Sequence, residues 1–326
     1  MDKLTVVLGD YPHAQPLLDG DVTVDGYLVE PVEVTPVIGA YRRMIRDLEF
    51  DVCELAPVSY LMARQEGIPL TAVPVFLNRR FHHGDVQCAA DSGIRVPRDL
   101  EGRRVGVRAY SVSTGVWVRG VLREEYGVDI DKITWVVDDD DHIEGRVPAN
   151  VERVTDGRSL GELLRAGEID AALTGNAGTG RAGAPRAGWT AAPETPAADE
   201  GPYPLFPEAG TLAVDHYLRT GVYPLHSLIA LRSELVERDP ELATTLYAAF
   251  AESKRRHLAA RPGWEATPRL ARQGQQIGGD PVPYGIGANR SSLDAMVRFA
   301  KDQGLLDTGF PADLPSLFAA GDYPDA

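Results

Sequence analysis

Cysteine is scarce in this chain, and the few cysteines form no motif. The 326 residues include only Cys53 and Cys88, each within a short apolar run. Their separation fits neither a zinc-binding nor a redox spacing, so nothing indicates a metal-stapled or disulfide-rich domain. A disulfide between them stays open, but we expect two buried, reduced thiols.

Long apolar runs are also missing. The apolar stretch near the N-terminus extends only from Leu4 to Leu8 and is followed by Gly9 and Asp10. A secretory signal needs roughly 7 to 15 apolar residues, so we expect no signal peptide. No run approaches the roughly 18 residues of a membrane span. We therefore expect a cytoplasmic protein with no membrane partner.

Basic residues are fewer than acidic ones. The chain has 33 Lys and Arg against 48 Asp and Glu, which gives a formal net charge of −15. Such a balance lacks the basic footprint that nucleic acids and anionic membranes attract, so we expect neither as a partner.

The length and composition indicate an ordered globular protein. A chain of 326 residues is long enough for about two domains. Its 44% hydrophobic and 25% charged side chains lie in the usual range for folded proteins. We expect a buried core that needs no metal or disulfide for support.

Strand and helix patterns alternate along the chain. Apolar residues in 37–50 recur at three and four positions, which predicts a helix, and short apolar runs on either side predict strands. This alternation is typical of parallel sheets with helical crossovers. We expect strands at 4–8, 23–34, 50–55, 69–76, 85–90, 103–110, 132–137, 150–154, 169–175 and 224–232. Further helices are expected at 58–67, 111–127, 159–167, 211–221, 241–260 and 289–304.

Two segments bear on the domain organisation. Residues 177–204 are rich in Gly, Ala and Pro, a composition that predicts a linker or a mobile loop. The chain after it has only one strong strand, 224–232, so it is a poor candidate for a domain of its own. We expect this tail to return to the first lobe.

Seven blocks, in their order along the chain, resemble the 4,5-dihydroxyphthalate decarboxylase family. They run from residue 9 to about residue 305, and their order makes the resemblance specific although each block alone is weak. The blocks are GDY at Gly9–Tyr11, FDVCEL at Phe50–Leu55, RRFHH at Arg79–His83, DSGI at Asp91–Ile94, VGVRAYSVSTGVWVRGVL at Val105–Leu122, TGVYPLH at Thr220–His226 and DPVPYGIGANRSSLDA at Asp280–Ala295.

The resemblance implies an α/β, two-lobed fold of the type II periplasmic-binding-protein kind. Each lobe would be a mainly parallel sheet flanked by helices, with lobe one formed by residues 1–90 plus 210–326 and lobe two by residues 91–209. The ligand would lie in a cleft between the lobes, at strand ends and helix N-termini. The same fold serves solute receptors and lyases, so the fold alone does not decide the chemistry.

The implied activity is a decarboxylation without a cofactor. It acts on a hydroxylated aromatic or related cyclic carboxylic acid, and it needs a proton donor, a carboxylate anchor and partial desolvation. We expect a small-molecule carboxylate as partner and no cofactor. No spacing of His and carboxylates calls for zinc or iron, so we expect no metal. A second copy of the chain stays open as a partner.

A polar insert between two apolar strands holds one candidate group. Strand alternation would place Arg80 and His82 on one face and His83 on the other. Histidine titrates near neutral pH, which suits proton donation. The alternative is a solvated hairpin rim with incidental charge.

A strand-to-helix turn holds a second group. Tyr110, Ser111, Ser113 and Thr114 lie where free backbone amides and the helix dipole could bind an anion. The alternative is a plain helix cap. Backbone amides at Gly175 and Asn176, after a later strand, could also face the ligand, whereas we expect core packing for Trp117.

A third group follows the first and third strands. Asp10 and Tyr11 would line a cleft wall, and Glu54 ends a buried strand. Glu54 either has a raised pKa and donates a proton or pairs with an arginine such as Arg80. His226 is either a core residue or exposed to the ligand.

The expected roles are therefore as follows. Ser111, Ser113 and Arg80 anchor the carboxylate, and His83 or Glu54 donates the proton, with His82 as a further catalytic candidate. The structural or solvated residues are expected to be His13, His142, His216, His257, Tyr284, Asn289, Arg290 and the acidic run Asp138–Asp141. The alternatives are a non-catalytic solute-binding protein and a lyase or dehydratase of the same fold that acts on a biosynthetic acid.

Overall fold

The structure, a computed structural model, describes residues 1–182, 190–191, 201–260, 264–265 and 267–326. Most of the loop predicted over 177–204 lies outside the described residues. Within that segment, β10 (Arg181–Ala182) and β11 (Thr190–Ala191) pair as two antiparallel strands.

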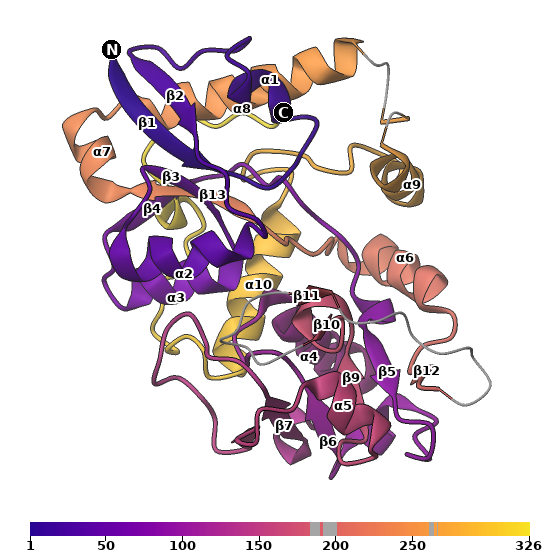
Figure 1. The fold of residues 1–326 in the computed structure, drawn as a ribbon. Coiled ribbons are helices and arrows are strands. Elements are labelled where there is room, and N and C mark those ends of the chain that lie inside the picture. The colour runs from indigo at the N-terminus through magenta and orange to yellow at the C-terminus, as the bar shows by residue number, and fades with distance from the viewer. Residues whose placement is uncertain (183–189, 192–200, 261–263, 266) are drawn as a thin grey trace. The chain divides into compact units, whose positions relative to one another are not determined.

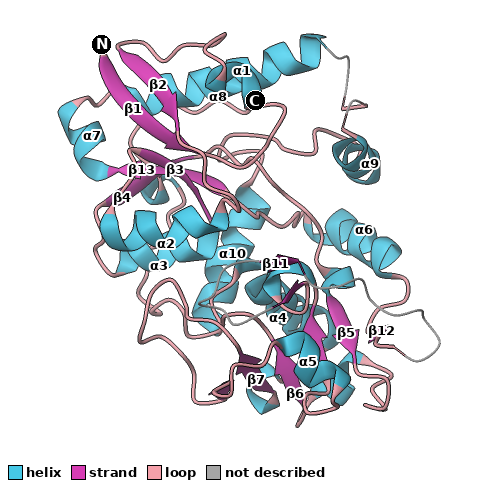
Figure 2. Cartoon of the chain, in the orientation of Figure 1, coloured by secondary structure: helices cyan, strands magenta, loops and turns pink. Residues whose placement is uncertain are grey.

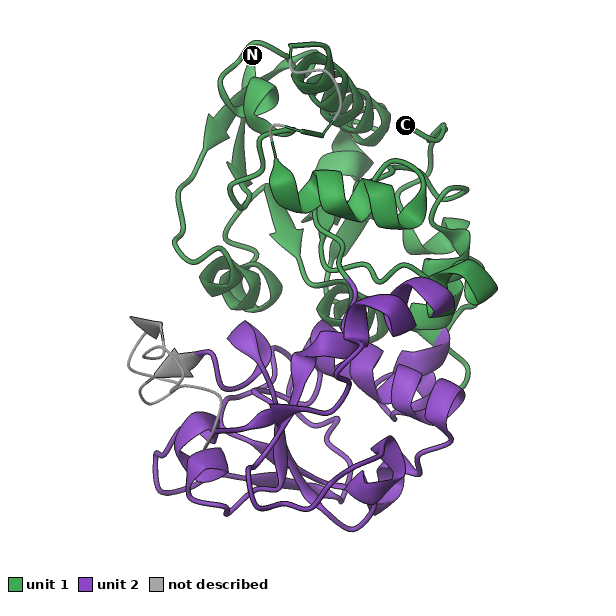
Figure 3. Ribbon diagram, turned by 90° about the vertical axis from the view of Figure 1, so that its right-hand side faces the viewer, with its two compact units in different colours: residues 1–80, 216–297, 308–326 green, residues 81–215, 298–307 purple. Residues whose placement is uncertain are grey.

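The chain forms two compact units, and each is discontinuous in sequence. Unit 1 comprises residues 1–80, 216–297 and 308–326, and unit 2 comprises residues 81–215 and 298–307 (Figure 3). The sequence analysis places the lobe boundaries near residues 90 and 210 and does not anticipate the return of residues 298–307 to unit 2.

Unit 1 is built on a five-stranded mixed sheet of order β2-β1-β3-β13-β4. β1 runs parallel to its neighbours β2 and β3, whereas β13 runs antiparallel to β3 and β4. The apolar stretch at the N-terminus is therefore an inner strand of a sheet. The strands are β1 (Asp2–Val7), β2 (Tyr27–Pro31), β3 (Val52–Leu55), β4 (Leu70–Val73) and β13 (Leu228–Arg232).

Helices cover both faces of this sheet (Figures 1 and 2). On one face, α1 and α8 pack over alternate strand residues such as Leu4, Val6 and Ile229. On the other face lie α2 and α3, and the buried stripe of α2 follows the helical period that the sequence predicts. The helices of unit 1 are α1 (Gln15–Leu18), α2 (Ile38–Asp47), α3 (Pro57–Gln65), α7 (Ser233–Arg238), α8 (Leu242–Ala260) and α9 (Pro268–Ile277).

Unit 2 is built on a six-stranded mixed sheet of order β12-β5-β9-β6-β7-β8. Its four strands β6 to β9 are parallel, and β5 runs antiparallel to β9. The strands are β5 (Val86–Cys88), β6 (Arg104–Gly106), β7 (Thr134–Val137), β8 (Val151–Arg153), β9 (Ala171–Leu173) and β12 (Tyr203–Pro204). Its helices are α4 (Ser113–Tyr126) and α5 (Leu160–Arg165), while α6 (Ala209–Thr220) and α10 (Arg290–Asp302) cross from one unit into the other.

The returning segment 298–307 packs against α4 within unit 2. The ring of Phe299 lies edge-on to Trp117, with ring centroids 5.7 Å apart, and Trp117 is fully buried as expected. Gly120 makes room for this ring, because a Cβ atom there would lie 2.0 Å from Cδ2 of Phe299. Close packing of this kind fixes the position of α4 in the unit.

Burial corrects the expectation for four histidines. His13, His142, His216 and His257 are predicted to be solvated, but all four are buried. The rings of Tyr11 and Trp264 lie 5.7 and 5.6 Å from the His13 imidazole. Burial, and then the charge of Lys254, lower the pKa of His13 to about 3. A neutral imidazole packs as an aromatic ring, which is why a histidine can enter such a cluster.

Both cysteines are buried and free, as expected. No helix in the described part of the chain is long and apolar enough to cross a membrane.

Candidate functional site

The candidate residues of unit 1 gather along one edge of its sheet, the edge that is formed by strand ends rather than by an outer strand. β1 and β3 end at this edge, and the antiparallel β13 begins there, with Leu228 opposite Leu55. The topology therefore brings together Asp10 and Tyr11 after β1, Glu54 near the end of β3, and His226 before β13. Ligands of open α/β sheets bind at such an edge.

Glu54 has a hydrogen-bond donor on each carboxylate oxygen. The Tyr11 hydroxyl donates to Oε1 over 2.7 Å, and the Gly9 amide donates to Oε2 over 2.8 Å. The side chain is buried, and neither of these two hydrogen bonds comes from an arginine such as Arg80.

The electrostatic setting of Glu54 favours its protonated form. Burial is the largest influence and raises its pKa, whereas hydrogen bonding from Tyr11, Gly9, Ser227 and Tyr41 acts in the opposite direction. Burial and the neighbouring carboxylate also raise the pKa of Tyr11 well above its ordinary value. A carboxylic acid whose pKa is raised can act as a proton donor.

Arg79 is the buried member of the Arg79–Arg80 pair. Its Nη1 donates to Oδ1 of Asn289 over 2.6 Å, its Nη2 donates to Oγ of Ser292 over 3.0 Å, and its guanidinium stacks over Tyr223 at 4.3 Å. Burial lowers the pKa of Arg79 to about 10, so it stays charged at neutral pH. The Arg79 side chain thus locks the segment before the half-buried Arg80, and Asn289 is structural, as predicted.

The remaining candidates of unit 1 differ in exposure. Asp10 is exposed, whereas Tyr11 and His226 are partly buried. The His226 backbone amide donates to the Asn78 carbonyl over 3.0 Å, which aligns the start of β13 with the chain that leads to Arg80.

Unit 2 holds the histidine pair, in a conformation that differs from the prediction. His82 and His83 are both buried, and His83 begins the short 3-10 turn η1 (His83–Asp85). The strand alternation expected over Arg80–His83 is wrong because the chain turns here, and so is the alternative of a solvated rim. The His83 ring lies edge-on to Phe206, with centroids 5.9 Å apart.

His82 is bonded to a carboxylate that the sequence analysis missed. Its Nδ1 lies 2.7 Å from Oδ2 of Asp85, and both residues are buried. The Asp85 amide donates to the His82 carbonyl over 3.0 Å, and the Thr174 amide donates to the Asp85 carbonyl over 2.9 Å. A His-x-x-Asp spacing just before a strand is the local signal that could have found the pair.

The other candidates of unit 2 lie at the same edge of its sheet. β5 begins beside the end of β9, where Val86 pairs with Leu173. Gly175 and Asn176 follow β9 and are exposed. The Arg108 amide, just after β6, donates to the Ala177 carbonyl over 2.8 Å. The ends of β6 and β9 and the start of β5 therefore meet, and they carry η1 and the start of α4.

The acidic run Asp138–Asp141 corrects another expectation. It is predicted to be a solvated loop, but Asp138, Asp139 and Asp141 are buried. Oδ1 of Asp141 accepts from the Ser111 amide over 2.6 Å, and Oδ2 of Asp139 lies 3.2 Å from Nη1 of Arg108. Amide and guanidinium donors offset the cost of burying the carboxylates.

Some of the hydrogen-bonding groups at the start of α4 are therefore already bonded to other residues of the chain. The Ser111 amide, an expected anion donor, has Asp141 as its acceptor. The Tyr110 hydroxyl donates to the Gln303 carbonyl over 3.4 Å. Ser113 and Thr114 are buried, and Oγ of Ser113 has no hydrogen-bond partner within the described residues. Ser113 is the residue of this group whose polar atom could still bind a ligand.

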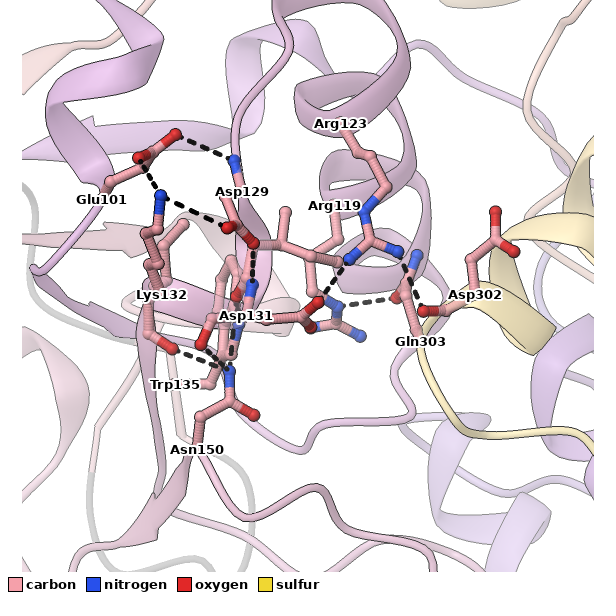
Figure 4. Close-up of polar contacts among 12 residues, drawn as sticks. Glu101, Arg119, Arg123, Asp129, Asp131, Lys132, Trp135, Asn150, Asp302 and Gln303 are labelled. Atoms are coloured by element: carbon pink, nitrogen blue, oxygen red, sulfur yellow. Dashed lines mark hydrogen bonds and ion pairs between the residues drawn. The ribbon is translucent and has the colours of Figure 1, made fainter.

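A buried arginine supports this helix start. Nε of Arg119 donates to Oε1 of Gln303 over 2.7 Å (Figure 4). Its Nη2 donates to the Tyr110 carbonyl. The guanidinium stacks on the Tyr110 ring at 3.9 Å and lies 5.1 Å from the Trp135 ring. One turn on, Arg123 bonds the Asp302 carbonyl over 3.0 Å, so the segment 298–307 ties down α4.

Among the described residues, no group of three or more His, Cys, Asp or Glu side chains could hold a metal ion. The groups that the structure assembles are acids, imidazoles, hydroxyls and guanidiniums. Such groups can transfer protons and bind polar ligands.

Comparison with known proteins gives relatives along nearly the whole chain. The 4,5-dihydroxyphthalate decarboxylase of Comamonas testosteroni is 31% identical over 329 residues, which cover 93% of this chain and 92% of that protein. The 4,5-dihydroxyphthalate decarboxylase of Pseudomonas putida is 34% identical over 185 residues, which cover 52% of this chain and 69% of that protein. A family model described as NMT1/THI5 like matches residues 43–175.

Solved structures agree on the fold. The periplasmic aliphatic sulphonate binding protein SsuA from Escherichia coli matches with a TM-score of 0.54 at 13% identity, and the match covers 98% of each chain. The chain thus has the α/β periplasmic-binding-protein fold that the sequence analysis expects.

Proposed function

Because the chain belongs to the 4,5-dihydroxyphthalate decarboxylase family, we propose that it is a carboxy-lyase that needs no cofactor and acts on a hydroxylated aromatic or related cyclic carboxylic acid. The relatives support a decarboxylase-like role. The substrate class, the reaction without a cofactor and the residue roles below are parts of the proposal.

The reaction makes three demands on the protein. A proton must reach the ring carbon that bears the carboxylate, and the carbon–carbon bond then breaks as carbon dioxide leaves. Ring hydroxyls donate electrons and lower the barrier to protonation. The protein supplies a proton donor, an anchor for the anion and partial exclusion of water.

The observation that carries the proposal is the buried His82–Asp85 pair at the sheet edge where α4 begins. It supplies an imidazole that a buried carboxylate holds in place. His83 and the protonated form of Glu54 are the other candidate donors, as in the sequence analysis. Ser113 and Arg80 are the proposed carboxylate anchors, while Ser111 contributes through a backbone amide that Asp141 now holds.

Carbon dioxide release tests the proposed reaction. The purified protein is mixed with 4,5-dihydroxyphthalate and with a panel of simpler hydroxybenzoates, without added metal or cofactor. We expect release from at least one acid that bears a ring hydroxyl and none from unsubstituted phthalate. If no acid in the panel releases carbon dioxide, the proposal of a hydroxylated aromatic substrate is wrong.

A variant of His83 tests its role within this reaction. If His83 donates the proton, His83→Ala abolishes turnover, and far-ultraviolet circular dichroism checks that the variant folds. Full activity in a folded His83→Ala protein removes His83 from the list of donors.

The fold also favours a second candidate function, a solute-binding protein. The fold match to the sulphonate binding protein SsuA motivates it. Calorimetry with each acid, followed by mass analysis of the recovered ligand, separates the two functions. A binding protein returns the ligand unchanged, a decarboxylase returns the product of carbon dioxide loss, and a dehydratase returns the product of water loss.

A further inference from the structure

We infer that Asp85 is a positioning residue that orients His82 and stabilises its charged form, so that His82 is the proton donor of the decarboxylation. The inference rests on the proposed function and goes beyond it by selecting one donor from three candidates and by giving a role to a residue that the sequence analysis missed.

The hydrogen bond between the two side chains defines the tautomer of His82. An ionised carboxylate can only accept hydrogen bonds, so the 2.7 Å contact requires the proton to be on Nδ1 of His82. The other ring nitrogen, Nε2, is then the atom through which His82 gains and loses a proton. This is how a carboxylate sets which nitrogen of a histidine takes part in chemistry.

The backbone holds Asp85 firmly enough for this task. The Asp85 amide bonds the His82 carbonyl within one 3-10 turn, and the Asp85 carbonyl accepts from Thr174 just after β9. The next residue, Val86, begins β5 and pairs with Leu173. Asp85 is thus fixed by a turn on one side and by a strand on the other, which gives a site the rigid support it needs.

The proton-transfer step balances with His82 alone. Imidazolium His82, with protons on Nδ1 and Nε2, transfers the Nε2 proton to the ring carbon that bears the carboxylate. The bond from that carbon to the carboxylate breaks, its electron pair restores the aromatic ring, and carbon dioxide leaves. His82 ends as the neutral imidazole with its Nδ1 proton still bonded to Asp85, and water restores the Nε2 proton. The carboxylate of Asp85 favours the imidazolium that starts this step.

The other two candidates have different surroundings. The His83 ring lies edge-on to the Phe206 ring. Glu54 already accepts two hydrogen bonds in unit 1. In the His82–Asp85 pair, one hydrogen bond determines which ring nitrogen of His82 carries the proton, and the carboxylate that accepts it favours the charged imidazolium.

The kinetic test replaces Asp85 by asparagine. Asp85→Asn keeps the shape and a hydrogen-bond acceptor but removes the charge, so kcat for 4,5-dihydroxyphthalate should fall by about 10²- to 10⁴-fold, the usual worth of general acid catalysis. KM should change far less than kcat, and Asp85→Glu should restore part of the loss.

Asp170→Asn is the matched control. Asp170 lies before β9, at the opposite edge of the same sheet, where Oδ2 accepts from the Arg104 amide over 2.9 Å and Oδ1 lies 3.1 Å from Nη1 of Arg103. If only the loss of a hydrogen-bonded carboxylate mattered, kcat would fall in both variants. If Asp85 positions His82, kcat falls only in Asp85→Asn. Equal kcat values for the two variants would overturn the inference.

A spectroscopic test needs neither activity nor an Asp85 variant. Long-range proton–nitrogen correlation spectra of the 15N-histidine-labelled protein report the tautomer of each ring, and His82→Gln identifies the signal of His82. We expect neutral His82 to have its proton on Nδ1, and a wild-type His82 protonated on Nε2 overturns the inference. If wild-type protein releases no carbon dioxide from any acid, the proposed function fails, and this spectrum still decides the His82–Asp85 arrangement.

Discussion

The Glu54→Gln variant should be more stable than wild type, by a margin that grows as the pH rises. The side-chain oxygen of the glutamine would accept from the Gly9 amide, and its NH2 group would donate to the Tyr11 hydroxyl, which can accept as well as donate. The Glu54→Gln variant therefore keeps the hydrogen bonds to Gly9 and Tyr11. It imitates protonated Glu54 and cannot acquire its charge.

The size of the effect follows from the raised pKa of Glu54. Burial, the largest influence, raises this pKa above its ordinary value of 4.5 in the folded protein. The folded state then holds the proton more tightly than the unfolded chain does, so stability is lost as the pH rises from the ordinary value through the folded pKa. The loss is about 1.4 kcal/mol for each unit by which the folded pKa exceeds the unfolded one. Glu54→Gln escapes this loss.

Urea unfolding followed by circular dichroism measures the difference. Wild type and Glu54→Gln are compared between about pH 4.5 and 8.5, and all other titrating groups cancel in the subtraction. We expect near-equal stability at the acidic end, then a growing advantage for glutamine that levels off at the folded pKa of Glu54.

Glu162→Gln serves as the control of opposite sign. The Ser159 amide and hydroxyl lower the pKa of Glu162 below its ordinary value of 4.5, so its glutamine variant should lose stability relative to wild type only as the pH rises toward 4.5 and keep a constant difference above it. If Glu54→Gln also loses stability relative to wild type, or if its difference is flat, the folded protein does not raise the pKa of Glu54. Glu54 would then be removed from the list of proton donors.

Two further predictions concern packing and thiol reactivity. Gly120→Ala should destabilise by about 1–3 kcal/mol although alanine favours a helix by about 1 kcal/mol, because the new Cβ would lie 2.0 Å from Cδ2 of Phe299. In the same urea assay, Gly210→Ala in α6 should instead be neutral or stabilising, because nothing lies within 4 Å of the position that its Cβ would take. If both variants change the stability in the same direction, the packing described for Gly120 is wrong. Cys53 and Cys88 should resist Ellman's reagent in the native protein and react in urea, because burial raises both thiol pKa values, that of Cys88 to about 12. Rapid labelling of the native protein would refute this.

The sequence is a good guide where one pattern repeats over many residues. The helical spacing over 37–50 gives α2, and the apolar run 224–232 gives the strand that rejoins the first sheet. The positions of Glu54 and Tyr11 at strand ends also follow from local pattern, since carboxyl ends of parallel strands meet at one edge.

Burial of polar residues is where sequence reasoning fails. The run Asp138–Asp141 is too polar for a core by composition, yet the Ser111 amide and Arg108 bond it there. Nothing local tells which of Arg79 and Arg80 is buried, because the partners of Arg79 come from residues 223 and 289–292. The partners of a polar group decide its burial, and these partners are distant in sequence.

The strand order of unit 1 dictates how late its sheet can be completed on the ribosome. β3 and β4 are made by residue 73, but β13, which lies between them, is made only at residues 228–232. The chain leaves the ribosome N-terminus first, so nearly all of unit 2 is synthesised before unit 1 can close. Until then β3 and β4 have strand edges that could pair with other chains. A ribosome that stalls before Leu228 therefore holds a three-stranded sheet of β2, β1 and β3 and a β4 that lacks its partner strand. A holding chaperone would have its greatest effect in this interval.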